Sequence, residues 1–160
     1  MWVAAFCGLF SGEGYINIAR RRQDRDPNKN WVYSPEVTIN LRYDEAPALQ
    51  DLQAHLGGRV NFYANRTQNT NSHDQVRWTV TGYAPVQAVL ELLITCPIPT
   101  RKIREAQVVL EFITWRDTQG CFLGETAQTS QDYLDRLREL RHLDCKSAFG
   151  HGSDISAELS

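Results

Sequence analysis

The segment from Phe6 to Gly14 combines small residues with one carboxylate at a spacing that can support metal chemistry. Ala4, Gly8 and Gly12 recur every four residues, so one face of a helix here carries almost no side chains. Glycine inside a helix costs up to about 1 kcal/mol relative to alanine, and such stripes favour close packing of two backbones. The chain has one helix of this kind, so we expect a second copy as its partner across a two-fold axis, with contacts at Ala4, Gly8, Ser11 and Gly12.

Pairing of this helix would give Glu13 a chemical role. Glu13 lies just past the helix, so the two copies would approach each other near the axis. A carboxylate assisted by the backbone carbonyl of Gly12 is a set of hard oxygen ligands suited to Mg²⁺ or another divalent cation. Such a metal activates water and stabilises the leaving oxygen of a phosphodiester. The alternative is a helix packed inside its own domain, with Glu13 an ordinary surface residue.

The elements that position this segment follow from the periodicity of the apolar residues. The pattern predicts a helix, two strands, a helix, two strands, a helix and further helices, at residues 2–11, 15–21, 31–42, 45–56, 59–66, 75–81, 84–95, 101–116 and 130–143. Polar loops are predicted at 23–30 and 67–74. We expect a single α+β domain over residues 1–145 and a flexible tail over 146–160.

The predicted strands carry an unusual polar face. A solvated sheet face favours Thr, Lys and Glu, whereas this one is rich in Arg, Asn and Gln, whose geometry matches base edges and phosphates. By alternation, the face holds Asn17, Arg21, Ser34, Thr38, Asn40, Arg42, Arg59, Asn61, Tyr63, Gln75 and Arg77. A plain solvent-facing sheet would explain the same alternation.

Composition predicts a folded intracellular protein without a membrane segment. The chain has 160 residues with 42% hydrophobic content, and its longest apolar run, residues 2–10, is half a bilayer span without a basic leader. The net charge is −2 and the pI about 6.1. Eight of the 17 basic residues nevertheless fall in two clusters, so a basic patch or a solvated arginine loop can form, at Arg20, Arg21, Arg22, Arg25 and Lys29 and at Arg101, Lys102 and Arg104.

The four cysteines predict neither a zinc site nor a disulfide framework. Cys7, Cys96, Cys121 and Cys145 are scattered and include no C-x-x-C pair. We therefore expect free thiols in the core or at the surface.

The glycine-rich segment resembles the motif that names the LAGLIDADG homing endonucleases. Gly8, Leu9, Glu13 and Gly14 fall in register with that motif. Phe6, Cys7 and Phe10 are apolar or small substitutes, and Ser11 replaces the first Asp of the motif. The resemblance continues through the αββαββα order to about Arg116 and includes the Gly57-Gly58 turn after the second helix. A single motif copy resembles the homodimeric branch of this family.

This resemblance implies a homodimer that makes Mg²⁺-dependent double-strand breaks in a near-palindromic DNA site of roughly 20 base pairs. Genes of such enzymes usually lie in or beside an intron or intein. Glu13 matches the acidic position that binds the catalytic metal, with the Gly12 carbonyl assisting. Lys102 matches a catalytic lysine that polarises the scissile phosphate or orients water. The base-reading positions of the family match Asn17, Ala19, Arg21, Ser34, Glu36, Thr38, Asn40, Arg42, Arg59, Asn61, Tyr63, Gln75 and Arg77.

A second class of function stays open, namely a DNA- or RNA-binding protein on the same scaffold that does not cleave. An intron maturase or a transcription regulator would be examples. Arg136, Arg138 and Arg141 are available for an RNA role, although acidic residues are interleaved with them. A protein-interaction domain without nucleic acid is the third alternative, and the Arg- and Asn-rich sheet face argues against it.

Overall fold

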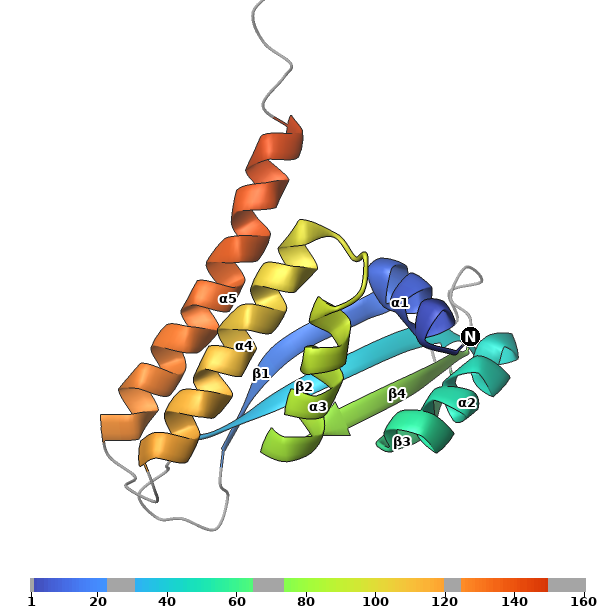
Figure 1. Cartoon of the computed structure of the whole chain (residues 1–160), viewed down its shortest axis with the longest axis horizontal. Helices are drawn as coiled ribbons and strands as arrows, with labels where there is room; N and C mark the ends of the chain where they lie inside the picture. The colour runs from blue at the N-terminus through green and yellow to red at the C-terminus, as the bar shows by residue number, and fades with distance from the viewer. Residues whose placement is uncertain (1, 23–30, 65–73, 120–124, 150–160) are drawn as a thin grey trace, which may run out of the picture.

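The protein is built on one antiparallel sheet with helices gathered on one of its faces (Figure 1). A computed structural model describes residues 2–22, 31–64, 74–119 and 125–149. The elements follow the order α1 (Trp2–Glu13), β1 (Gly14–Arg22), β2 (Trp31–Arg42), a 3-10 turn η1 (Tyr43–Glu45), α2 (Ala46–Leu56), β3 (Arg59–Tyr63), β4 (Gln75–Thr81), α3 (Tyr83–Ile94), α4 (Thr100–Gln119) and α5 (Glu125–Phe149). The strand order is β1-β2-β4-β3. The predicted α+β class and αββαββα order are therefore confirmed.

The core lies between the helices and the apolar face of the sheet. Alternate strand residues such as Ile16, Ile39 and Trp78 are fully buried, as their period of two predicts. The Phe6 ring of α1 packs edge-on against Trp78, with 6.1 Å between ring centroids. The Trp78 indole also donates a hydrogen bond to the carbonyl of Gly57, at 2.9 Å. One buried aromatic thus anchors both α1 and the end of α2 to the sheet.

The turn after α2 requires glycine, as expected. Gly57 and Gly58 have φ angles of 69° and 85°, in the left-handed region that favours glycine. A Cβ on Gly58 would lie 2.7 Å from the carbonyl oxygen of Thr79. This close approach lets β3 start beside β4 immediately after α2.

The last helix is longer than predicted. α5 continues to Phe149, so the predicted tail from Lys146 begins too early. Residues 146–149 contain no glycine or proline, and the first helix breaker is Gly150. The predicted loops at 23–30 and 67–73, Asn65 and Arg66 of the predicted third strand, Cys121 and residues 150–160 lie outside the described residues.

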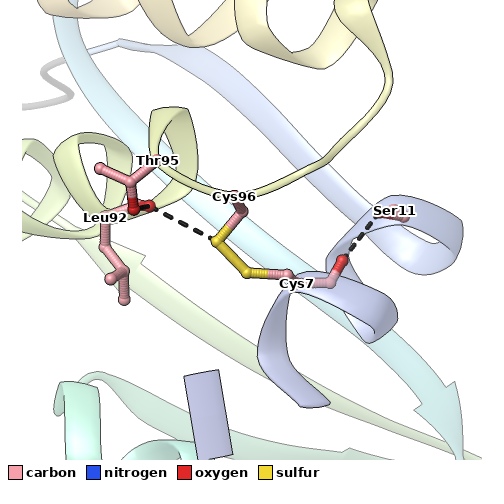
Figure 2. Close-up of a disulfide and its surroundings, with 5 residues drawn as sticks. All are labelled: Cys7, Ser11, Leu92, Thr95 and Cys96. Carbon is pink, nitrogen blue, oxygen red and sulfur yellow. Dashed lines mark hydrogen bonds between the residues drawn. A yellow bond between two sulfur atoms is a disulfide. The ribbon is translucent and has the colours of Figure 1, made fainter. Parts of the chain in front are cut away.

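A disulfide joins α1 to the turn after α3, contrary to the expectation of free thiols (Figure 2). Cys7 and Cys96 are 89 residues apart in the sequence, and both are buried. The expectation was wrong for this pair because the fold, not local spacing, brings the two cysteines together. Figure 2 also shows the Ser11 hydroxyl donating to the Cys7 carbonyl, at 2.8 Å, within the same helix.

In the described part of the chain, no helix has the length and apolar character needed to cross a membrane.

Candidate catalytic centre and nucleic-acid interface

The junction between α1 and β1 exposes the predicted metal ligands. α1 ends at Glu13 and β1 begins at the next residue, so no loop separates the carboxylate from the sheet. Glu13 and Gly12 are both exposed. A Cβ on Gly14 would lie 2.4 Å from the Phe10 ring, so only glycine allows the chain to turn so tightly from helix to strand.

Lys102 of α4 lies against the same junction. Its side chain is 5% exposed, and its ammonium donates hydrogen bonds to the carbonyls of Phe10, at 2.5 Å, and Gly14, at 2.9 Å. The Phe10 carbonyl belongs to the last turn of α1, where the helix dipole favours a cation. An ammonium has three donors, so one remains for a ligand. The structure therefore brings together Glu13 and Lys102, which are 89 positions apart in the sequence.

The surroundings of Lys102 act on the pKa of its ammonium in both directions. Burial lowers the pKa of its ammonium below the ordinary value for lysine, and the neighbouring charge of Arg101 lowers it further. The carboxylates of Glu105 and Glu13 act in the opposite direction and raise this pKa. Glu13 is therefore close enough for its charge to influence Lys102, as a shared site requires.

A buried ion network that the sequence analysis missed holds α4 and α5 against β1. Glu105 is 3% exposed and pairs with Arg101, at 3.6 Å, and with Arg141 of α5, at 3.4 Å. Arg141 also donates to the Tyr15 hydroxyl, at 2.7 Å, and to the Ile16 carbonyl, directly after the Glu13 junction. The i,i+4 spacing of Arg101 and Glu105 was a usable signal, whereas nothing local links Arg141 to β1.

The strand register arranges the predicted DNA contacts in rows across the polar face. Asn17 lies opposite Glu36, and Ala19 opposite Ser34. Arg77 lies between Asn40 and Asn61. Gln75 lies between Arg42 and Tyr63 in the next row. Apart from Thr38, the predicted contact residues are exposed or half-buried, so one continuous polar surface exists on the side of the sheet away from the core.

Thr38 is the exception among the predicted contact residues. It is 5% exposed, because it lies directly between Tyr15 on β1 and Thr79 on β4. Alternation correctly assigned its side of the sheet but could not indicate that its neighbours would cover it. We therefore remove Thr38 from the surface available to DNA.

Arg21 and Arg77 of the polar face contact side chains of neighbouring strands. Arg21 forms an ion pair with Glu36, at 3.3 Å. The Nε of Arg77 donates to the side-chain oxygen of Asn40, at 2.6 Å, and its guanidinium lies 4.9 Å from the centre of the Tyr63 ring. These contacts limit the conformations that the arginines adopt before any ligand binds.

The α5 arginines considered for RNA binding are each paired with a carboxylate. Arg136 pairs with Glu111 at 2.9 Å, and Arg138 with Asp135 at 3.0 Å. Arg141 is occupied by Glu105. α5 therefore does not present an unbalanced basic surface at these three positions.

The small-residue face of α1 is open rather than packed inside the domain. Ala4, Gly8 and Gly12 are exposed, and a Cβ on either glycine would meet no atom within 4 Å. A shallow hollow beside this face is lined by Ala4, Gly8, Ser11 and residues 95–97 of the turn after α3. The buried side of α1 carries Phe6, Cys7 and Phe10 instead. Packing within the chain thus gives no reason for the glycines.

Solved structures share the fold of this chain over most of its length. The homing endonuclease I-CvuI, in complex with an I-CreI target, has a TM-score of 0.64 at 20% identity, covering 94% of this chain and 96% of its own. I-TnaI, another homing endonuclease, also has a TM-score of 0.64, at 16% identity over 88% of this chain and 96% of its own. The LAGLIDADG homing endonuclease I-GzeII, in complex with its DNA target, has a TM-score of 0.60 at 16% identity, covering 99% of this chain and 51% of its own.

The chain has the fold of the LAGLIDADG homing endonucleases. No protein-family model and no curated protein matches its sequence. Within the LAGLIDADG fold, the motif segment forms α1, Glu13 ends that helix and the polar face belongs to the four-stranded sheet. At identities of 16–20%, the similarity concerns the fold, and what each side chain can do depends on its own contacts in this chain.

Substitution of Gly8 by leucine tests whether the open face of α1 forms a dimer. Because a side chain at Gly8 meets no atom of its own chain, Gly8→Leu should keep the melting temperature of the fold while blocking close helix packing. We expect sedimentation velocity to show monomers for Gly8→Leu and dimers for the wild type. An unchanged dimer would exclude this face as the interface. Ala48→Leu, at an exposed position of α2, is the matched control and should remain dimeric.

Proposed function

We propose that the protein is a homodimeric, Mg²⁺-dependent endonuclease that cuts both strands of a long, near-palindromic DNA site. The observation that carries this proposal is the position of the Lys102 ammonium at the end of α1, beside Glu13 and next to the polar face of the sheet. Hydrolysis of a DNA phosphodiester needs a carboxylate that binds metal, a cation that stabilises the phosphate and a polar surface that holds the DNA.

The residues at the α1 end fit a divalent cation. The Glu13 carboxylate and the Gly12 carbonyl are hard oxygen donors in an exposed position. The described residues contain no group of three His, Cys, Asp or Glu that could hold a metal within one chain. A second copy, water and DNA phosphate would supply the remaining ligands. When bound, Mg²⁺ would supply Lewis-acid stabilisation of the phosphodiester and activation of water.

Lys102 supplies the positive charge of the centre. Its two carbonyl contacts hold the ammonium in place, so little rearrangement is needed when a phosphate arrives. Its remaining N–H would donate to a phosphate oxygen or orient the attacking water. Burial strengthens this interaction because the surrounding dielectric is low.

Dimerisation follows from the open face of α1 and from the need for a second carboxylate. Two paired α1 helices would bring both copies of Glu13 close to a common axis, with one sheet on each side. A chain with one such unit would then read two half-sites as a symmetric pair.

The polar face is the proposed DNA surface despite the net charge of −2. Two of its arginines, Arg21 and Arg42, pair with carboxylates, but both contacts of Arg77 are with neutral side chains. The arginines and amides of this face lie on the side of the sheet away from the core, where they can meet phosphates and base edges.

Replacing the Glu13 carboxylate by an amide tests the proposed reaction. Glu13→Gln keeps the shape but weakens metal binding, so double-strand cutting should fall by about 100- to 1,000-fold, as when one group that stabilises the developing charge is lost. Cutting would be scored on a library of random-sequence duplexes with and without Mg²⁺, and binding of the recovered site by gel shift. Binding should persist within a few-fold. Glu91→Gln, at an exposed α3 position, should cut normally. Undiminished cutting by Glu13→Gln would exclude Glu13 as a metal ligand.

The lowered pKa of Lys102 predicts opposite pH dependences for activity and stability. As pH rises through this lowered pKa, the ammonium loses its charge, so cleavage should decline below the pH at which an ordinary lysine titrates. Between the lowered and the ordinary pKa the unfolded chain binds more protons at Lys102, so this residue makes the free energy of unfolding rise with pH. Cleavage rates and urea unfolding of wild type and Lys102→Met across pH 7 to 10 would measure both. A decline in cleavage that follows unfolding would contradict this role.

A further inference from the structure

Arg77 is held on the polar face by neutral side chains from both neighbouring strands. It lies on β4, an inner strand of the sheet, between β2 and β3. Its Nε donates to the Asn40 side-chain oxygen, at 2.6 Å, from β2. Its guanidinium lies over the Tyr63 ring of β3, 4.9 Å from the centroid. Asn40 and Tyr63 therefore fix the direction of the arginine from two sides.

The other face arginines with a described ion pair are held differently. Arg21 pairs with Glu36, at 3.3 Å, and Arg42 pairs with Asp44, at 3.6 Å, so carboxylates offset both positive charges. Both contacts of Arg77 are with neutral side chains, so neither of them offsets its positive charge. Its two Nη groups have no hydrogen-bond partner among the described residues. The free end of Arg77 is consequently a fork of N–H donors.

A fork of donors needs two adjacent acceptors. In the DNA major groove guanine presents O6 and N7 side by side, and no other base edge offers two acceptors in this arrangement. Arginine is suited to this bidentate contact because its guanidinium is planar and rigid. Fixing the guanidinium before binding also reduces the conformational entropy that binding removes.

We infer that Arg77 reads one guanine in each half-site and that Asn40 and Tyr63 are positioning residues for that contact. This inference rests on the proposed function, since it assigns part of the DNA specificity of the same surface. It gives Asn40 a supporting role in place of the direct base contact predicted for it from the sequence.

The strand register indicates which part of the half-site holds this guanine. Gly14, the residue after Glu13, lies opposite Ile39 on β2, so the row of Asn40 and Arg77 is level with the end of α1. Arg21 lies opposite Val32, eight residues further along β2, which is roughly 26 Å at the rise of a strand. The guanine should therefore lie in the inner part of the half-site, near the scissile phosphates.

The test is enrichment of bound duplexes from a random-sequence library by the full chain, with Ca²⁺ replacing Mg²⁺ so that bound DNA is retained. The wild type should enrich a symmetric site with a guanine in its inner part. Arg77→Met removes every N–H donor, so preference for that guanine should fall roughly 5- to 150-fold while preferences at other positions persist. Arg77→Gln should shift the same position towards adenine, and it gives a second variant should one fold poorly.

The supporting roles are tested in the same enrichment. Asn40→Ala and Tyr63→Leu should weaken preference at the position that Arg77 controls, and combining either with Arg77→Met should cause no further loss. Arg138→Lys, at an exposed position of α5 where the arginine pairs with Asp135, is the control and should leave that position unchanged. Melting temperatures would verify that each variant is folded.

Three results would overturn the inference. The first is that Arg77→Met keeps the guanine preference, and the second is that binding of Arg77→Gln weakens uniformly at all positions, as expected for a phosphate contact. The third is that Asn40→Ala changes a different position, which would make Asn40 a base reader. If the wild type enriches no site at all, the proposed function itself fails, and this outcome is distinct from the other three.

Discussion

The Lys102 ammonium, hydrogen-bonded to the carbonyls of Phe10 and Gly14, is the contact on which the proposed catalytic centre depends. It joins the first turn of α4 to the point at which α1 becomes β1. The Cys7–Cys96 disulfide joins α1 to the turn that precedes α4. The Glu105–Arg141 pair adds a third connection from α5 to the beginning of β1. A carboxylate and a cation from distant parts of the sequence are thereby kept at one location.

The two faces of the sheet have different roles, since the apolar face stabilises the fold and the polar face is the proposed DNA-binding surface. The apolar side is buried beneath the helices, whereas the polar side makes few contacts that the fold requires. Side chains such as Arg77 and Gln75 can therefore differ between proteins of this fold without loss of the core. This division is consistent with a fold that persists at 20% identity or less.

The sequence predicted features that depend on local periodicity, and it did not predict contacts made at long range. The small face of α1, the side of the sheet on which the polar residues lie and the Gly57-Gly58 turn follow from spacing alone. The position of Lys102 beside Glu13 was expected only through the family resemblance. The Cys7–Cys96 disulfide and the contacts of Arg141 with β1 join residues 89 or more positions apart, and burial of Thr38 depends on neighbouring strands. Such features are set by tertiary packing, which periodicity does not encode.

We propose that each protomer of a two-fold dimer carries its own catalytic cation beside shared carboxylates. A heterodimer of one wild-type protomer and one Lys102→Met protomer, purified through two different affinity tags, would test this proposal. A recovered target duplex in a supercoiled plasmid would be the substrate, and open-circular and linear products would be separated on a gel. The heterodimer should nick one strand and accumulate open circles, whereas the wild-type homodimer produces linear DNA. Linear product formed by the heterodimer at the wild-type rate would contradict the assignment of one Lys102-dependent centre to each protomer.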